Sequence, residues 1–102
     1  MRLTITALAL AGLFCLPASA ATGKELYDKS CKACHGAQGE GNPGMAKMLK
    51  VEIRHLGSPE VQKSTDAQLK KAILEGTGKM KPVKLSAADA DAVVAFVRTL
   101  KK

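Results

Sequence analysis

Apolar residues recur at helical spacing in three stretches of the chain, and each stretch begins with residues that typically cap a helix. The first covers residues 22–35 and opens with the capping-box pattern T-x-x-E. The second starts at Thr65 with the related pattern T-x-x-Q and ends before Gly76, and the third follows Ser86 and runs towards the C-terminus. The repeating apolar positions are Leu26, Tyr27, Cys31 and Cys34 in the first stretch, Leu69, Ile73 and Leu74 in the second, and Ala90, Val93, Val94, Val97 and Leu100 in the third.

The segments between these helices are less regular. Residues 36–44 hold four glycines and Pro43, and residues 76–83 form a second loop rich in glycine and lysine. Residues 45–49 predict one apolar turn of helix. Residues 51–56 alternate apolar and polar side chains but have no visible strand to pair with, so their conformation stays open. The pattern therefore predicts an all-α fold, in which two long loops join three main helices. Because residues 36–57 have little regular structure for a compact domain, we expect them to wrap around a functional site.

The first twenty residues have the pattern of a secretory signal peptide. Arg2 precedes an apolar run over residues 3–16, and Ala18-Ser-Ala20 matches a cleavage site. The run is too short and wrongly flanked for a membrane span, and a retained N-terminal anchor is the alternative. We therefore expect cleavage of residues 1–20, export to the periplasm, and a single mature domain, residues 21–102, with no membrane span.

The expected mature chain is small, basic and poor in aromatic residues. Tyr27 and Phe96 are its only tyrosine and phenylalanine, so a domain of this size needs extra apolar bulk or a covalent staple to complete its core. Cleavage leaves 15 Lys and Arg against 9 Asp and Glu, an excess that favours acidic partners. Because an exported chain without a binding motif is not expected to bind nucleic acid, an acidic protein surface is the expected partner.

The run Cys31-Lys-Ala-Cys34-His35 is the main chemical feature of the chain, with the C-x-x-C-H spacing of a c-type haem attachment site. On one helix these three side chains would share a face, so two thiols could form thioethers to a porphyrin while the imidazole binds its iron. A zinc site would want more ligands, but the only other histidine is His55. A thioredoxin-like pair would want a βαβ context, and a plain disulfide would leave the adjacent histidine unexplained.

With these features the chain resembles a small bacterial monohaem cytochrome c of class I, along essentially all of residues 21–102. The resemblance rests on the motif and the glycine that follows it, on the Gly39-Glu-Gly41-Asn-Pro43 loop, on Met80 in its glycine-containing loop, and on the helix that contains Phe96. It implies the cytochrome c fold around one covalently attached haem c. It also implies that the first and last helices cross near Gly23, with Phe96 and Tyr27 close to the contact.

The resemblance also assigns roles to individual residues. Cys31 and Cys34 would hold the haem, His35 would be the proximal iron ligand, and the carbonyl of Pro43 would accept a hydrogen bond from His35. Met80 matches the distal ligand, although the family more often has proline directly after this methionine, and here a lysine intervenes. The rival distal ligand is His55, but a lone histidine beside an arginine is more often solvated.

An iron with both axial positions filled can exchange electrons but cannot bind a substrate. The resemblance therefore implies a monomeric one-electron carrier between redox proteins of a respiratory chain, without enzymatic activity. The alternative is a haem enzyme or sensor with an open distal iron position. Lysines near the expected haem edge would steer an acidic redox partner by long-range attraction. These lysines are Lys32, Lys47, Lys79, Lys81 and Lys84.

Overall fold

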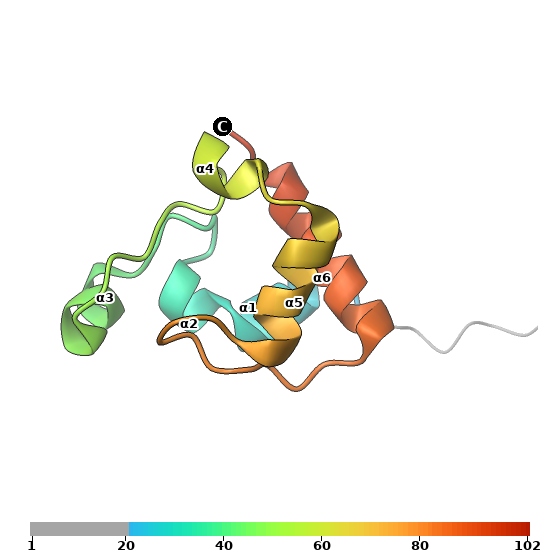
Figure 1. Cartoon of the computed structure of the whole chain (residues 1–102), viewed down its shortest axis with the longest axis horizontal. Coiled ribbons are helices and arrows are strands. Elements are labelled where there is room, and N and C mark those ends of the chain that lie inside the picture. The colour runs from blue at the N-terminus through green and yellow to red at the C-terminus, as the bar shows by residue number, and fades with distance from the viewer. Residues whose placement is uncertain (1–20) are drawn as a thin grey trace, which may run out of the picture.

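The computed structural model describes residues 21–102, in which the chain forms six helices and no β-strand (Figure 1). The helices are α1 (Gly23–Ser30), α2 (Lys32–His35), α3 (Pro43–Leu49), α4 (Pro59–Gln62), α5 (Asp66–Glu75) and α6 (Ala87–Thr99). This arrangement confirms the predicted all-α fold. None of these six helices is long and apolar enough to cross a membrane. The expected signal peptide, residues 1–20, lies outside the described residues.

The core is formed where α1 and α5 pack against α6. A Cβ atom placed on Gly23 of α1 would overlap the backbone carbonyl of Ala92 in α6, so the two helices approach as closely as glycine permits. Next to this contact the rings of Tyr27 and Phe96 lie 4.9 Å apart and tilted by 49°. The expected crossing of the first and last helices is thus confirmed. The buried apolar residues are Leu26, Tyr27, Cys31, Ile73, Ala90, Val93, Val94 and Val97.

Short-range capping bonds begin the three longer helices where the sequence predicts them. The hydroxyl of Thr22 accepts the backbone N–H of Glu25 at 3.2 Å. Thr65 and Gln68 form a complete capping box, with bonds of 3.1 and 2.8 Å in the two directions. Ser86 caps α6 by accepting a backbone N–H three residues on, at 3.1 Å. Each of these bonds satisfies an N–H that has no partner within the helix.

The prediction of one helix over residues 22–35 is wrong at one residue. The chain leaves α1 at Cys31, where φ is −119° and ψ is −31°, and a separate short helix, α2, follows. The carbonyl of Cys31 still accepts the N–H groups of Cys34 and His35, at 3.2 and 3.0 Å, so the expected three- and four-residue spacing survives the break. The change of direction lets the Cys31 side chain join the core while α2 faces a cavity.

The prediction that the irregular loop extends over residues 36–44 is also wrong, because the loop ends at Asn42. Pro43 is the first residue of α3, and the side chain of Asn42 caps this helix by accepting the N–H groups of Gly44 and Met45, at 2.9 and 3.3 Å. Asn followed by Pro is a typical N-cap and first-turn pair, so the signal was present in the sequence. The predicted apolar turn over residues 45–49 is the remainder of this helix.

Two non-helical segments, residues 36–42 and 50–58, connect α3 to the rest of the molecule, and Figure 1 shows α3 set apart from α1, α5 and α6. The alternating residues 51–56 do not form a strand. Val51 and Ile53 are half-buried whereas Glu52 and Arg54 are exposed, so the alternation over these four residues reflects a segment that is covered on one side.

Arg98 of α6 secures the chain between α4 and α5, a role that the sequence did not reveal. Its guanidinium donates to the carboxylate of Asp66 at 2.8 and 2.9 Å, and to the carbonyls of Gln62 and Ser64 at 3.0 and 2.6 Å. The N–H groups of the guanidinium thereby satisfy backbone carbonyls in a segment that contributes no buried side chain to the core.

We expect Gly23→Ala to destabilise the protein, because its methyl group would press on the α6 backbone rather than on a movable side chain. Overpacking of this kind typically costs about 1–3 kcal/mol, more than the gain in helix propensity of up to about 1 kcal/mol. The measurement is the free energy of unfolding of the haem-loaded protein in urea. Gly44→Ala is the control, because that glycine also lies in the first turn of a helix and its Cβ would approach only the Asn42 side chain, at 3.3 Å. Equal stability of Gly23→Ala and wild type would contradict the close contact.

Candidate functional site

A cavity of about 980 Å³ lies between α2, α3, α5 and the loop that follows α5. Its volume is near the top of the range of roughly 300–1,000 Å³ that is typical of small-molecule and cofactor sites. All three residues of the C-x-x-C-H motif line it. The apolar part of the opposite walls comes from Met45, Leu49, Val51, Ile53, Leu56, Val61, Ala72, Met80, Pro82 and Val83.

The two thiols differ in their surroundings. Cys31 is buried, whereas Cys34 is half-buried, and the two sulfur atoms are not joined to each other. Burial, with a smaller contribution from the neighbouring Cys34, raises the pKa of the Cys31 thiol to about 11. The Cys31 side chain is therefore a neutral thiol at neutral pH while it is free.

The imidazole of His35 is half-buried beside the thiols, and burial lowers its pKa. At neutral pH the ring is therefore uncharged and has a lone pair free to bind a metal. Its Nδ1 atom is buried without a hydrogen-bond partner, so the expected bond to the carbonyl of Pro43 is not formed in this structure. The backbone leading to that proline is close, because the N–H groups of Gly41 and Asn42 donate to the carbonyls of His35 and Cys34, at 2.6 and 2.9 Å.

Tyr27 holds the turn that follows His35. Its hydroxyl donates to the carbonyl of Gly36 at 2.5 Å, and the side chain is fully buried beneath this contact. Gly36 has a φ of +81°, which a residue with a side chain rarely adopts, so the turn depends on glycine here. Burial raises the pKa of Tyr27 to about 12. Helical spacing placed Tyr27 in the core, but only the tertiary structure brings its hydroxyl to Gly36.

Met80 lies on the cavity wall at the end of a tight turn. The backbone groups of Thr77 and Met80 are joined by two hydrogen bonds, of 3.0 and 2.9 Å, and Gly78 between them has a φ of +55°. Gly76 precedes the turn with a φ of +78°, and a Cβ atom there would come within 2.5 Å of the Met80 carbonyl oxygen. The conformations of Gly76 and Gly78 thus restrict the position of the Met80 backbone.

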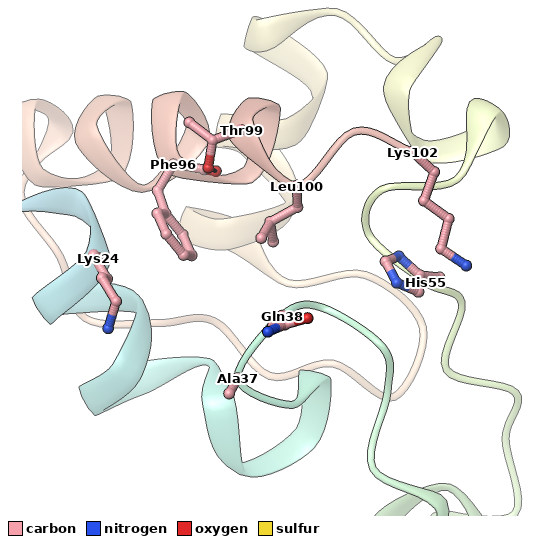
Figure 2. Close-up of a pocket in the computed structure, with 8 residues that line it drawn as sticks. All are labelled: Lys24, Ala37, Gln38, His55, Phe96, Thr99, Leu100 and Lys102. Carbon is pink, nitrogen blue, oxygen red and sulfur yellow. Dashed lines mark hydrogen bonds between the residues drawn. The ribbon is translucent and has the colours of Figure 1, made fainter.

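The rival ligand His55 lies elsewhere, in a smaller pocket of about 500 Å³ between α6, the start of α1 and the loop after α2 (Figure 2). Figure 2 shows His55 beside Lys102 at one end of this pocket. Its Nδ1 atom accepts the N–H of Gly57 at 2.9 Å. His55 does not line the large cavity, so the structure brings Met80, and not His55, to the walls shared with the motif.

Three of the five lysines singled out in the sequence line the large cavity, and all three are exposed: Lys79, Lys81 and Lys84. Lys32 and Lys47 are also exposed but do not line it. Positive charge is therefore concentrated on the loop that also contains Met80. These three ammonium groups therefore lie beside the cavity and are open to solvent.

The residues around the large cavity fit a covalently attached haem. They supply two reduced thiols, a neutral imidazole with one nitrogen atom buried and unpaired, and a thioether, all set in an apolar wall. Residues 21–102 contain no group of three or more His, Cys, Asp or Glu side chains arranged to hold a metal ion by themselves. The cavity wall instead holds thiol, imidazole and thioether groups of the kinds that attach a haem and bind its iron.

Comparisons with known proteins agree with this donor set. The sequence model of the cytochrome c family matches residues 20–101. Cytochrome c-554(547) of Halothiobacillus neapolitanus is 40% identical over 88 residues, which is 80% of this chain and 97% of that protein. Among solved structures, the c-type cytochrome KustC0563 is similar with a TM-score of 0.69 and 31% identity, over 80% of this chain and 100% of its own. Cytochrome cL from Hyphomicrobium denitrificans gives a TM-score of 0.60 and 28% identity, over 78% of this chain and 46% of its own.

We expect Tyr27→Phe to lower stability by about 1 kcal/mol at pH 7, because the Gly36 carbonyl loses a buried partner. The stability gap between wild type and Tyr27→Phe should depend on pH. The folded pKa of about 12 lies above the unfolded value of about 10, so the contribution of Tyr27 is complete below pH 10 and is lost as the pH rises through 12. Urea unfolding of both haem-loaded proteins between pH 7 and 12 measures the gap. A gap that stays constant or widens would contradict this role.

Proposed function

The chain belongs to the cytochrome c family and carries covalently attached haem c, and we propose that it is an exported one-electron carrier with iron held between His35 and Met80. The observation that carries this proposal is the position of Met80 on the wall of the cavity that the C-x-x-C-H motif lines. Residues 1–20 would serve as a signal peptide that is removed on export, and residues 21–102 would act in the periplasm as a monomeric domain.

The motif residues would hold the cofactor on one side. Cys31 and Cys34 would form the thioether links, since both residues line the cavity, one at the break between α1 and α2 and the other within α2. When bound, haem supplies an iron couple that changes by one electron. His35 would bind the iron through Nε2, because burial keeps its imidazole neutral.

The proximal histidine needs an acceptor for its second nitrogen, which orients the ring and strengthens the ligand. We assign this role to the carbonyl of Pro43. The preceding residues Gly41 and Asn42 are already bonded to the backbone of α2, and the Nδ1 atom of His35 is buried without another partner, which supports this assignment.

Met80 would bind the iron on the other side. A thioether is a soft, uncharged ligand that stabilises the reduced iron and raises the reduction potential. With both axial positions occupied there is no open coordination position for a substrate, which favours an electron carrier over an enzyme. The second candidate function, a haem enzyme or sensor with an open distal position, requires Met80 to stay off the iron.

The partners we propose are redox proteins of a respiratory chain that present acidic surfaces. The lysines at the cavity edge are exposed and close to the site of electron exchange, and the chain has an excess of basic residues. Attraction between such a surface and an acidic one accelerates association and weakens as salt screens it.

We expect Met80→Ala to remove the red iron–sulfur charge-transfer band from the spectrum of the oxidised protein. It should also let the reduced protein bind carbon monoxide readily at neutral pH and lower the reduction potential. The drop should be on the order of 0.1 V, a part of the roughly 0.8 V that axial ligands span. Met45→Leu is the control, since Met45 also lines the cavity but on α3. Ready binding of carbon monoxide by the wild type would instead favour the enzyme or sensor.

We expect the double substitution Lys81→Glu and Lys84→Glu to slow electron transfer to an acidic redox protein by about tenfold at low salt, because it reverses charge at the cavity edge. The difference should shrink as salt rises. Stopped-flow kinetics over a range of ionic strengths measures it. Lys29→Glu with Lys63→Glu is the matched control, with the same change in charge at exposed residues that do not line the cavity. Equal slowing by both pairs would show that only net charge matters.

A further inference from the structure

A single side chain joins the loop that carries Met80 to the far end of α3. The ammonium group of Lys79 donates a hydrogen bond of 2.7 Å to the backbone carbonyl of Leu49, 30 residues earlier in the chain. Leu49 and Lys79 both line the large cavity, so the bond closes part of its rim.

The carbonyl of Leu49 is a favourable partner for a lysine. Leu49 is the last residue of α3, and the chain then turns at Lys50 into the left-handed conformation, with a φ of +55°. The turn satisfies the carbonyls of Ala46 and Lys47 but leaves that of Leu49 to another donor. A positive charge at this carboxyl end also suits the helix dipole.

The donor of this bond, Lys79, is also the residue that directly precedes Met80. Lys79 lies inside the turn that the two hydrogen bonds between Thr77 and Met80 close. A displacement of the Met80 backbone from the cavity wall would therefore move Lys79 with it and strain the bond to Leu49. The restriction at Gly76, whose Cβ would be 2.5 Å from the Met80 oxygen, leaves this turn few alternative conformations.

The rest of α3 is held only near its amino end. There, Asn42 donates to the carbonyls of Cys34 and Ala33, at 2.9 and 3.0 Å. Among the hydrogen bonds and ion pairs of residues 21–102, the Lys79 bond is the one that ties residues 47–51 to another part of the chain. No residue of α3 is buried by the rest of the protein chain, so contacts with other helices add little to that attachment.

We propose that Lys79 is a positioning residue, a latch between Leu49 and the Met80 turn that controls how readily Met80 leaves the iron. The proposal rests on the proposed role of Met80 as distal ligand. Lys81 provides the contrast, because it flanks Met80 on the other side and also lines the cavity, yet no side-chain hydrogen bond or ion pair within residues 21–102 involves it. An effect of the latch must therefore be confined to Lys79, whereas an effect of charge must appear at both.

The test compares haem-loaded wild type, Lys79→Ala, Lys79→Arg and Lys81→Ala. The first measurement is the rate at which imidazole, a neutral ligand, binds to the oxidised iron when Met80 must leave first. We expect Lys79→Ala to bind about fivefold faster, the effect of losing a charge-assisted hydrogen bond at an exposed position. Lys79→Arg should restore the wild-type rate because a guanidinium can also donate to the carbonyl, and Lys81→Ala should leave it unchanged.

The second measurement is amide hydrogen exchange over residues 47–51, which does not depend on the iron ligand. We expect exchange there to be about fivefold faster in Lys79→Ala than in the other three proteins. Unchanged exchange in Lys79→Ala, or equal effects of Lys79→Ala and Lys81→Ala, would overturn the latch. If the wild type binds imidazole without delay, the assignment of Met80 fails, while the exchange data still decide the latch separately.

Discussion

The packing of α1 against α6 is the interaction on which the rest of this structure depends. Most of the fully buried side chains belong to these two helices, and the contact is close because Gly23 lets the backbone of α6 approach. From this contact Tyr27 reaches to the carbonyl of Gly36 and secures the turn after the motif. The C-x-x-C-H motif is thus positioned by the small apolar core that α1, α5 and α6 form.

The half of the molecule that contains α3 and α4 is built differently from the core of α1, α5 and α6. Neither α3 nor α4 has a buried residue, and five apolar residues within 45–56 instead line the large cavity: Met45, Leu49, Val51, Ile53 and Leu56. This half is held by individual polar contacts, such as the fork of Arg98 and the bond from Lys79 to Leu49. An apolar group in the cavity would give these segments the core they lack, and its attachment would thereby stabilise the folded form of residues 36–63.

The sequence predicted the helix starts that depend on hydrogen bonds between residues only a few positions apart. The caps at Thr65 and Ser86 are where the patterns place them, because each involves a partner three residues away. It missed the break at Cys31, because regular apolar spacing does not report a change in helix direction between the core and a cavity. It also missed the start of α3 at Pro43, where the glycines on either side obscured a normal Asn-Pro start.

By itself, the sequence determined the attachment chemistry, since two thiols and an imidazole within five residues can serve one porphyrin whatever the rest of the chain does. The tertiary structure decided which distant side chain shares their cavity. Met80 and His55 are both plausible ligands in the sequence, and only the folding of the loops brings the first to the cavity and turns the second away. The physical reason is distance along the chain: contacts between residues dozens of positions apart depend on how the helices pack, which no local pattern encodes.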